Sequence, residues 1–343
     1  MEIKINNSVK TLFIGLVFIY YIIGNVVCCQ GSQIIILKNN GESYKNYTKI
    51  QYAIDSASDG DTIYISNGTY HENLIINKSI SIIGENRENT IIKGDGTEIL
   101  IHVSEKNVNI SRITFINGNI GIYVKGRNNV LSNTSISNVS LLNNNVSIYF
   151  SDVSNSNIID SNIENNTDGI ILYNSSYNVI SNNVICLQKN IGMSLWENSN
   201  HNQVSFNIIY DNDLGLLLKR WNDGNIIKNN IFNNNSLGIY LLLFSNTTFY
   251  DNIIDDNYYG IRLKQSLGNN GIFNNTITDN YYGIDVDQLI EYNLTENYLF
   301  NNTYDINYEA EMPRIKTPGF DNFIFVFLMC IFTLLIKKRI LYF

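Results

Sequence analysis

A glycine-led repeat runs through most of this chain and constrains its fold more than any other feature. An apolar residue follows each glycine, and a second apolar residue comes two positions after the first. Successive repeats are 22, 23 or, once, 26 residues apart, and a serine takes the glycine position in one of them. The repeat positions are Gly121, Ser147, Gly169, Gly192, Gly215, Gly238, Gly260 and Gly283. A short, regular period of this kind is typical of a solenoid in which each repeat forms one turn.

Two further series divide each repeat into three short strand-like segments. An asparagine followed by a strand-like pair occurs at Asn162, Asn183, Asn207, Asn230, Asn252, Asn275 and Asn297. An apolar series lies between the others, at Ile158, Val179, Val204, Ile226, Phe249, Ile272 and Leu294. Each period therefore contains three strands separated by asparagine-rich corners.

The repeat predicts an all-β fold, a right-handed parallel β-helix with three-strand coils of 22–23 residues and roughly ten coils. The chain has 58 Asn, 56 Ile and only three Ala, a composition that opposes a helical fold. The period is too short for a propeller blade, and the Leu-x-x-Leu-x-Leu framework of leucine-rich repeats is absent. We expect isoleucine to fill the interior, and asparagine to turn the corners and to form ladders along the axis.

A short capping helix is predicted before the first coil. Thr48 and Gln51 have the spacing of a capping box, Gly60 could end the helix, and Asp61–Ser66 alternates as the first strand. The apolar residues Ile50, Ala53, Ile54 and Ala57 share one helical face. At the other end, residues 305–316 are expected to close or to leave the β-helix.

The two ends of the chain differ from its body. Residues 1–31 resemble a secretory signal peptide, with Lys4 and Lys10 before an apolar run, although an uncleaved anchor is the alternative. Residues 318–343 contain an apolar span followed by Lys337, Lys338 and Arg339, which predicts a transmembrane segment with a cytoplasmic basic end. We therefore expect a β-helix domain at 32–310 and a linker at 311–317, held outside the cell.

Charge and cysteine content fit an extracellular body. The net charge of −8 argues against nucleic acid as a partner. Cys186 is the one cysteine between the predicted leader and the C-terminal segment, so no disulfide framework is expected. Fourteen Asn-x-Ser/Thr sites follow the leader. The glycosylation candidates include Asn46, Asn77, Asn138, Asn174, Asn246 and Asn293.

Two regions of the chain resemble known proteins: the body, over about residues 45–305, and the C-terminal tail. Lys49–Asn73 and Ile80–Glu85 are similar to the opening of secreted right-handed β-helix proteins, including the NosD-like group, pectin methylesterases and archaeal surface proteins. This resemblance implies the fold and says little about activity, because many activities share the scaffold. Pro318, Gly319 and Phe320 begin a tail that resembles the PGF-type archaeal sorting signal. That resemblance implies an archaeosortase partner and lipid attachment at the archaeal cell surface; a plain membrane anchor is the alternative.

A catalytic site is not evident. Asn166-Thr167-Asp168-Gly169 resembles one motif of the polygalacturonases, but Lys189-Asn190 occupies the position of the second acid one coil later. Uronide hydrolysis needs a carboxylate pair, so we interpret Asp168 as a turn residue. The motifs of pectin methylesterases and epimerases are also missing. Whether the chain is an enzyme stays open, although we favour a non-catalytic role over a lyase or hydrolase.

No cofactor is expected. The NosD-like resemblance implies copper delivery, but His71, His102 and His201 are far apart, and Met193 and Cys186 do not complete a ligand cluster. An acidic corner could hold calcium, with solvated carboxylates as the plainer interpretation. Its residues are Asp251, Asp255, Asp256 and Asp279.

The outward positions of the glycine-led strands carry the most suggestive surface. Alternation along each strand predicts exposed aromatic and basic side chains in register on one sheet. The candidate binding residues are Tyr149, Tyr173, Trp196, Lys219, Trp221, Tyr240, Arg262 and Lys264. We expect this strip to bind envelope or extracellular polysaccharide, with the basic residues contacting acidic groups. The alternatives are aromatic stacking that only stabilises the sheet, and a purely structural envelope protein.

Overall fold

The computed structural model describes most of the chain between residues 35 and 309. The described ranges are 35–39, 43–126, 130–242, 245–264, 270–287, 294 and 296–309. The chain divides into two compact units, Met1–Asn307 and Tyr308–Phe343. Only Tyr308 and Glu309 of the second unit are described.

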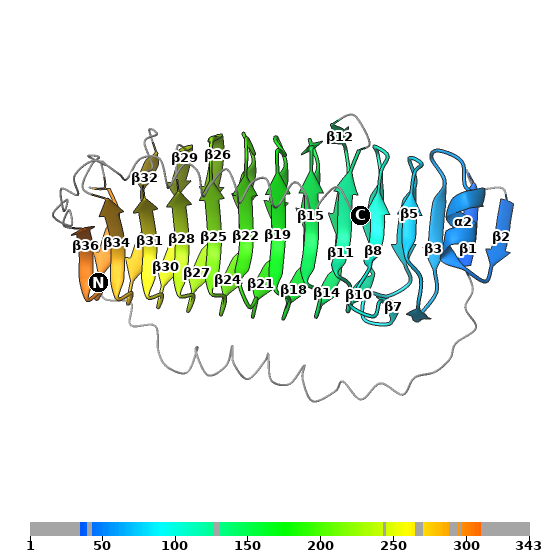
Figure 1. Cartoon of the computed structure of the whole chain (residues 1–343), viewed down its shortest axis with the longest axis horizontal. Coiled ribbons are helices and arrows are strands. Elements are labelled where there is room, and N and C mark those ends of the chain that lie inside the picture. The colour runs from blue at the N-terminus through cyan, green and yellow to red at the C-terminus, as the bar shows by residue number, and fades with distance from the viewer. Residues whose placement is uncertain are drawn as a thin grey trace, which may run out of the picture. The chain divides into compact units, whose positions relative to one another are not determined.

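The first unit is a parallel β-helix of about 10 turns with three long sheets, as the repeat predicts (Figure 1). Each coil contributes one strand to each sheet. Strands from neighbouring coils pair in parallel, so that equivalent residues of successive repeats lie side by side. We name the three sheets A, B and C in the order in which the chain meets them within a coil.

The strands follow one another along each sheet in spatial order. Sheet A contains β2 (Ser43–Tyr47), β1 (Ile35–Asn39), β3 (Thr62–Ile65), β6 (Ser81–Gly84), β9 (Asn109–Ser111), β13 (Ser135–Ser137), β17 (Asn157–Ile159), β20 (Val179–Ser181), β23 (Gln203–Ser205), β26 (Asn222–Lys228), β29 (Ser245–Tyr250) and β32 (Gly271–Phe273). Sheet B contains β4 (Gly68–Tyr70), β7 (Thr90–Lys93), β10 (Thr114–Ile116), β14 (Ser140–Leu142), β18 (Asn162–Glu164), β21 (Val184–Cys186), β24 (Ile208–Tyr210), β27 (Ile231–Asn233), β30 (Ile253–Asp255), β33 (Thr276–Thr278) and β35 (Tyr298–Phe300). Sheet C contains β5 (Leu74–Ile76), β8 (Ile99–Val103), β11 (Ile120–Lys125), β15 (Val146–Ser151), β19 (Asp168–Tyr173), β22 (Ile191–Trp196), β25 (Leu214–Lys219), β28 (Leu237–Leu242), β31 (Tyr259–Lys264), β34 (Tyr282–Asp287) and β36 (Tyr304–Glu309). A small extra pair joins β12 (Leu131–Ser132) to β16 (Val153–Ser154).

The interior is built from stacked apolar side chains. The residue after each repeat glycine points inward, and its equivalents in successive coils pair with one another with none of their surface exposed. One such column is Ile148, Ile170, Met193, Leu216, Ile239, Ile261 and Ile284. Burying each of these side chains stabilises the fold by about 1.5–3 kcal/mol.

The repeat glycines stack directly on one another. A Cβ atom added to Gly192 or Gly238 would lie 2.8 or 2.7 Å from the carbonyl oxygen of the next glycine in the column. These distances are well below normal van der Waals contact, so the close approach of backbone favours glycine at these two positions. Ser147 is accommodated at the equivalent position with a fully buried side chain.

The apolar series in sheet A is misaligned at two of its predicted positions. Ile180 and Ile227 continue the interior column, whereas Val179 and Ile226 point outward and are 37% and 38% exposed. A shift of one residue moves a strand side chain to the opposite face. Each of these strands has two adjacent apolar residues, and the predicted series contains the first of them. Periodicity alone does not show which of the two points inward.

The predicted asparagine ladders are confirmed. In one of them, the side-chain oxygen of each buried Asn accepts the backbone and side-chain N–H groups of its equivalent one coil earlier, at 2.9–3.1 Å. This ladder runs through Asn183, Asn207, Asn230, Asn252, Asn275 and Asn297. Asn162 is not a member, contrary to the prediction: it is exposed at the start of β18, and Ser161 takes the ladder position.

Where two adjacent asparagines form a corner, each has a different structural role. The first of the pair turns the chain with a positive φ, as in Asn165 (56°) and Asn234 (50°). The second is buried and joins a ladder, as in Asn166 and Asn235. Asparagine tolerates the left-handed conformation better than most residues, and its amide can satisfy buried backbone groups. Both properties are needed at each corner, which explains the abundance of asparagine.

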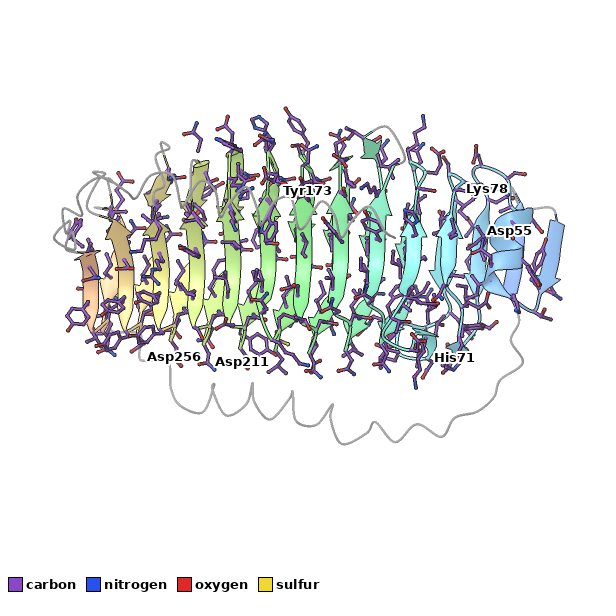
Figure 2. All side chains as sticks on the ribbon, viewed as in Figure 1. Asp55, His71, Lys78, Tyr173, Asp211 and Asp256 are labelled. Atoms are coloured by element: carbon purple, nitrogen blue, oxygen red, sulfur yellow. The ribbon has the colours of Figure 1, made fainter. Side chains whose placement is uncertain are left out.

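The capping helix α2 (Ile50–Ser56) covers the N-terminal end of the core, and Ile50, Ala53 and Ile54 are fully buried. The predicted capping box is wrong, because the N-cap residue is Lys49 and no side-chain cap comes from the helix itself. Glu72 instead accepts the N–H groups of Ile50 and Gln51. Lys78 donates to three carbonyl oxygens at the other end, including that of Asp55 at 2.6 Å (Figure 2).

The antiparallel hairpin of β1 and β2 was not predicted. β1 pairs with β3 and extends sheet A beyond the first coil. This hairpin occupies the edge that the first coil would otherwise leave open in sheet A, a common way to protect an edge strand.

At the C-terminal end, β36 adds a last strand beside β34 in sheet C. Residues 305–309 therefore continue the β-helix, whereas 310–316 lie outside the described residues. The predicted signal peptide at 1–31 and the sorting segment at 318–343 also lie outside them. Within the described part of the chain, no helix is long and apolar enough to cross a membrane.

Candidate functional site

The outer face of sheet C places the predicted strip in register. Two outward columns run along the axis, one through the middle of the strands and one through their last residues. Tyr149, Tyr240 and Arg262 lie in the middle column. Tyr173, Trp196, Lys219 and Lys264 lie in the terminal column.

The aromatic row is not continuous. In the middle column, Ile171, Ser194 and Leu217 separate Tyr149 from Tyr240. In the terminal column, Tyr173 and Trp196 are the adjacent aromatic pair. The predicted strip is therefore better described as separate clusters.

The most suggestive of these is the Tyr173–Trp196–Lys219 cluster, which we name the sheet C cluster. Its three residues occupy successive coils. The ammonium group of Lys219 lies over the indole ring of Trp196, 5.3 Å from the ring centroid, which is within cation–π range. Tyr173 is 38% exposed, and Figure 2 labels it on sheet C. The cluster combines an aromatic surface with a positive charge.

Tyr149 belongs to a second aromatic group nearer the N-terminus. His102 stacks on Tyr123 with ring centroids 5.2 Å apart, and Tyr123 contacts Tyr149 at 5.3 Å. Burial, together with the neighbouring tyrosines Tyr123 and Tyr173, raises the pKa of Tyr149 to about 12. Its hydroxyl is therefore a neutral hydrogen-bonding group over the physiological pH range. These contacts are also those expected of rings that stabilise the sheet.

The basic residues of β31 occupy the two outward columns of sheet C. The Nε atom of Arg262 lies 3.0 Å from a carboxylate oxygen of Asp285, one coil further on. The guanidinium also packs 4.3 Å from the ring centroid of Tyr259. Arg262 is thus already paired with an acid, which argues against its predicted role as a carboxylate ligand. Lys264 lies beside Leu242 in the terminal column.

Trp221 lies off the sheet. It follows β25 at a corner, has a φ of 44° and is 57% exposed. The adjacent Arg220 forms an ion pair with Glu197. Trp221 is therefore an exposed ring near the sheet C cluster in sequence, but it is not part of the same column.

Asp168 is the first residue of β19 and not a turn residue as predicted. Its carboxylate accepts hydrogen bonds from the Asn190 side chain at 2.9 Å and from the Ile191 N–H at 3.2 Å. Burial raises its pKa, although these two hydrogen bonds oppose that effect. Asn190, an amide, stands where a second acid would be needed, so Asp168 lacks the partner required for paired-carboxylate chemistry.

The candidate metal ligands are dispersed. Met193 and Cys186 are both buried. His201 stacks on Tyr177 with centroids 4.9 Å apart. Over the described residues, no group of three or more His, Cys, Asp or Glu side chains could hold a metal ion. The four residues of the acidic corner do not form such a group in the described part of the chain.

The described glycosylation candidates are exposed. Asn46, Asn77, Asn138 and Asn246 lie on the surface. Asn174 is exposed as well, but its amide donates a hydrogen bond to Asp152 at 2.6 Å. Asn293 lies outside the described residues. Which of these sites carry glycan stays a prediction.

A tyrosine cluster at the corner between sheets B and C was missed. The Tyr-Tyr pairs 258–259 and 281–282 stack on one another in successive coils, with equivalent ring centroids 4.9 and 4.8 Å apart. The sequence contains an indication of this arrangement, because the Tyr-Tyr dipeptide recurs one repeat apart. The predicted surface positions begin after each glycine and therefore do not include the tyrosines that precede it.

Two family models match the chain. Residues 98–241 match the right handed beta helix region, and residues 190–316 match the periplasmic copper-binding protein (NosD). The expected resemblance to NosD-like right-handed β-helix proteins is therefore confirmed. The copper-binding description belongs to that family, and the described residues of this chain provide no corresponding ligand group.

A cell surface glycoprotein from Methanothermus fervidus is 31% identical to this chain over 166 residues. The match covers 46% of this chain and 28% of that protein, so this chain spans under a third of the length of that relative. Among solved structures, the A-module of a mannuronan C-5 epimerase from Azotobacter vinelandii is similar with a TM-score of 0.63 and 19% identity, covering 76% of this chain and 82% of that one. The catalytic domain of a GH87 alpha-1,3-glucanase in complex with nigerose has a TM-score of 0.51 and 14% identity, covering 77% and 64%. These structural similarities show the fold alone.

Proposed function

We propose that this β-helix is a non-catalytic cell-surface protein that binds acidic polysaccharide of the envelope or the surroundings. The observation that carries the proposal is the sheet C cluster, in which Tyr173, Trp196 and Lys219 occupy equivalent positions of three successive coils. A surface location is supported by the similarity to a cell surface glycoprotein.

The cluster has the chemical groups that such a ligand requires. The C–H faces of a sugar ring pack well against an indole or phenol ring, and a rigid sheet holds these rings in place at little entropic cost. Lys219 supplies a compact positive charge for a carboxylate. The cation–π contact at 5.3 Å fixes this charge beside the aromatic surface.

Polygalacturonate and alginate are suitable probes, because both are chains of acidic sugars. We expect the full chain to be retarded by at least one of them in affinity electrophoresis. Trp196→Ala and Tyr173→Ala should weaken this retention by about tenfold each, because each removes an aromatic surface. Tyr52→Ala, which removes an exposed ring from α2, is the matched control. Unchanged retention in both sheet C variants would overturn the proposal.

A polysaccharide lyase or hydrolase is the second candidate, and the raised pKa of Asp168 is the observation that favours it. This carboxyl is also half-buried beside Asn190. An enzyme would release reducing ends or unsaturated products from the same probes, and Asp168→Asn would abolish that release. Binding without products, at equal strength in Asp168→Asn, is the result expected for a non-catalytic protein.

Anchoring to the membrane is proposed through residues 318–343, either as a span or as a lipid that replaces it. An archaeosortase would be the partner in the second case. The mass of the C-terminal peptide from protein purified from its native membrane separates the two. A peptide that ends near Pro318 and carries lipid supports processing, and an intact Phe343 terminus supports a plain span.

A further inference from the structure

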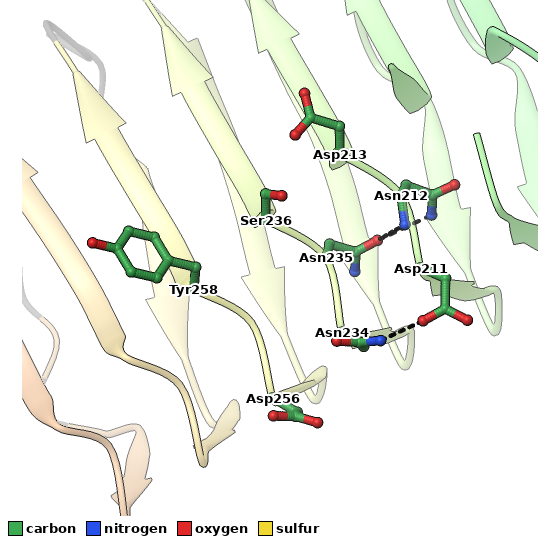
Figure 3. A pocket seen from close by; sticks show the side chains of 8 residues that line it. All are labelled: Asp211, Asn212, Asp213, Asn234, Asn235, Ser236, Asp256 and Tyr258. Carbon is green, nitrogen blue, oxygen red and sulfur yellow. Dashed lines mark hydrogen bonds between the residues drawn. The ribbon is translucent and has the colours of Figure 1, made fainter. Parts of the chain in front are cut away.

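The corner between sheets B and C contains a hollow at the end of the tyrosine cluster. The hollow is lined by two buried ladder asparagines and by Asp211, Asp213, Asn234, Ser236, Asp256 and Tyr258 (Figure 3). Its volume of about 490 Å³ is in the range of small-molecule sites. The hollow is open to solvent and has a polar lining, so it is not a packing void in the apolar core.

The hollow results from one small residue in a column of larger ones. Backbone hydrogen bonds place Ser236, Tyr258 and Tyr281 at equivalent positions of successive coils, with Asp213 one coil before Ser236. The tyrosine stack ends at Tyr258, because the next side chain in the column is that of serine. Room for a ligand therefore remains between the Tyr258 ring and the Asp213 carboxylate.

The ring at the edge of this space is held firmly. Tyr258 lies parallel to Tyr281 within 4°, with centroids 4.9 Å apart, and contacts Tyr259 edge-on at 4.8 Å. Parallel rings at this separation are offset, so part of each face stays open. In agreement with this, 52% of the Tyr258 surface is exposed. A rigid, exposed aromatic ring can accept a ligand without a large loss of conformational entropy.

Hydrogen-bond acceptors line the hollow together with this ring. The Asp211 carboxylate is positioned by the Asn234 amide at 2.5 Å. Among the described residues, we find no hydrogen-bond partner for the carboxylates of Asp213 and Asp256, which are both exposed. Free carboxylates are strong acceptors for hydroxyl groups.

We propose that this hollow binds a neutral sugar of a polysaccharide, with one sugar ring against Tyr258 and its hydroxyl groups donating to Asp213. Three carboxylates repel an acidic ligand, and the predominantly polar lining disfavours an apolar one. A metal ion is disfavoured because no group of three metal-binding side chains exists in the described residues. The site goes beyond the proposed function: it lies at the start of the sheet C strands, whereas the sheet C cluster lies at their ends, about 20 Å away along the strand.

The test is affinity electrophoresis of the full chain in gels containing dextran, mannan or galactomannan, which are neutral. At least one of them should retard the protein. Tyr258→Ala should weaken this retention by about tenfold. Ser236→Tyr is a second variant that extends the tyrosine stack by one ring and fills the hollow, so it should fold normally and also lose retention. Tyr52→Ala should behave like the wild type.

The proposals for the sheet C cluster and for the hollow can be tested separately. Trp196→Ala should leave retention by the neutral polysaccharide unchanged, and Tyr258→Ala should leave retention by polygalacturonate unchanged. No retention by any of the three neutral polysaccharides would overturn the inference, as would full retention in both Tyr258→Ala and Ser236→Tyr. A glycan attached at Asn234, detected by mass spectrometry of its peptide, would also contradict it, because the attached sugar would occupy the entrance.

Discussion

Glu72 caps the helix α2 from outside it, and its carboxylate accepts the backbone N–H of Ile50 at 3.1 Å. Its second oxygen accepts the N–H of Gln51 at the same distance. These two donors have no partner within the helix, because the first turn of any helix leaves its N–H groups free. The capping helix is thus attached to the first coil by a residue that lies 22 positions further along the chain.

We expect Glu72→Ala to lower the free energy of unfolding by about 1–2 kcal/mol, because two backbone donors lose a charged acceptor. Chemical denaturation followed by circular dichroism measures the change. Glu88→Ala is the control, since Glu88 is exposed and its ion pair is with the adjacent Arg87. Equal stability of the two variants would show that Glu72 does not hold the helix.

The asparagine ladders should contribute strongly to stability. Asn207→Ala removes the acceptor of the Asn183 N–H and the donor to the Ile180 carbonyl, and both groups are buried. We expect a loss of about 3–5 kcal/mol, since unsatisfied buried polar groups are costly. Asn162→Ala, at an exposed asparagine of the same sequence series, should change stability by less than about 0.5 kcal/mol. Thermal unfolding of both variants decides, and similar effects would contradict the ladder's role.

The glycine column allows a matched comparison between two substitutions. In Gly215→Ala, the new Cβ would lie 2.5 Å from the Gly238 carbonyl oxygen, a backbone atom that cannot move without shifting the next coil. We expect a loss of about 1–3 kcal/mol. In Gly271→Ala the nearest atom is 3.4 Å away, in the Phe273 side chain, so little loss is expected. A stable Gly215→Ala protein would show that the stacked coils can separate.

The sequence predicted the coil, its three strands and the inward column because these depend on a repeated alternation of apolar residues. It misplaced Val179 and Ile226, because two adjacent apolar residues satisfy the same pattern and only the neighbouring coil selects between them. It grouped Asn162 with the ladder asparagines, because only the register between coils shows that Ser161 takes the ladder position. Glu72 could not be identified as the cap, since its contact with Ile50 joins residues that meet only after the first coil has formed.

The candidate site was predicted less completely. Alternation along the strands correctly placed Tyr173, Trp196 and Lys219 on one face in adjacent coils. It could not show that Arg262 is paired with Asp285, because this depends on how two long side chains orient. The hollow beside Tyr258 depends on the small side chain of Ser236, which has no significance until the column is known.

Cys186 gives a pH-dependent prediction. Burial raises the pKa of its thiol from 9.0 to about 11. The folded protein therefore holds the thiol proton more tightly than the unfolded chain. The protonated thiol thus favours the folded state, and this contribution to stability is complete below pH 9 and is lost as the pH rises to about 11. We expect a decrease of up to about 2 kcal/mol between pH 8 and pH 11, which should be smaller in Cys186→Ala.

Alkylation checks the same group directly. Iodoacetamide should modify Cys186 slowly at pH 8 and rapidly after denaturation, because the thiolate is the reactive form. Peptide mass spectrometry resolves Cys186 from the other three cysteines of the chain. Equally fast modification in the folded state would contradict the burial of this side chain.

The most direct test of glycan binding by the sheet C cluster uses its own tryptophan as the reporter. The chain has two tryptophans, so Trp221→Phe leaves Trp196 as the one indole fluorophore. Titration of this variant with polygalacturonate should change the Trp196 emission in a saturable manner, and Lys219→Ala should weaken the response by about tenfold. Two results would contradict the account. One is Trp196 emission that stays constant at polygalacturonate concentrations that retard the protein in the gel. The other is the absence of both the emission change and the retardation.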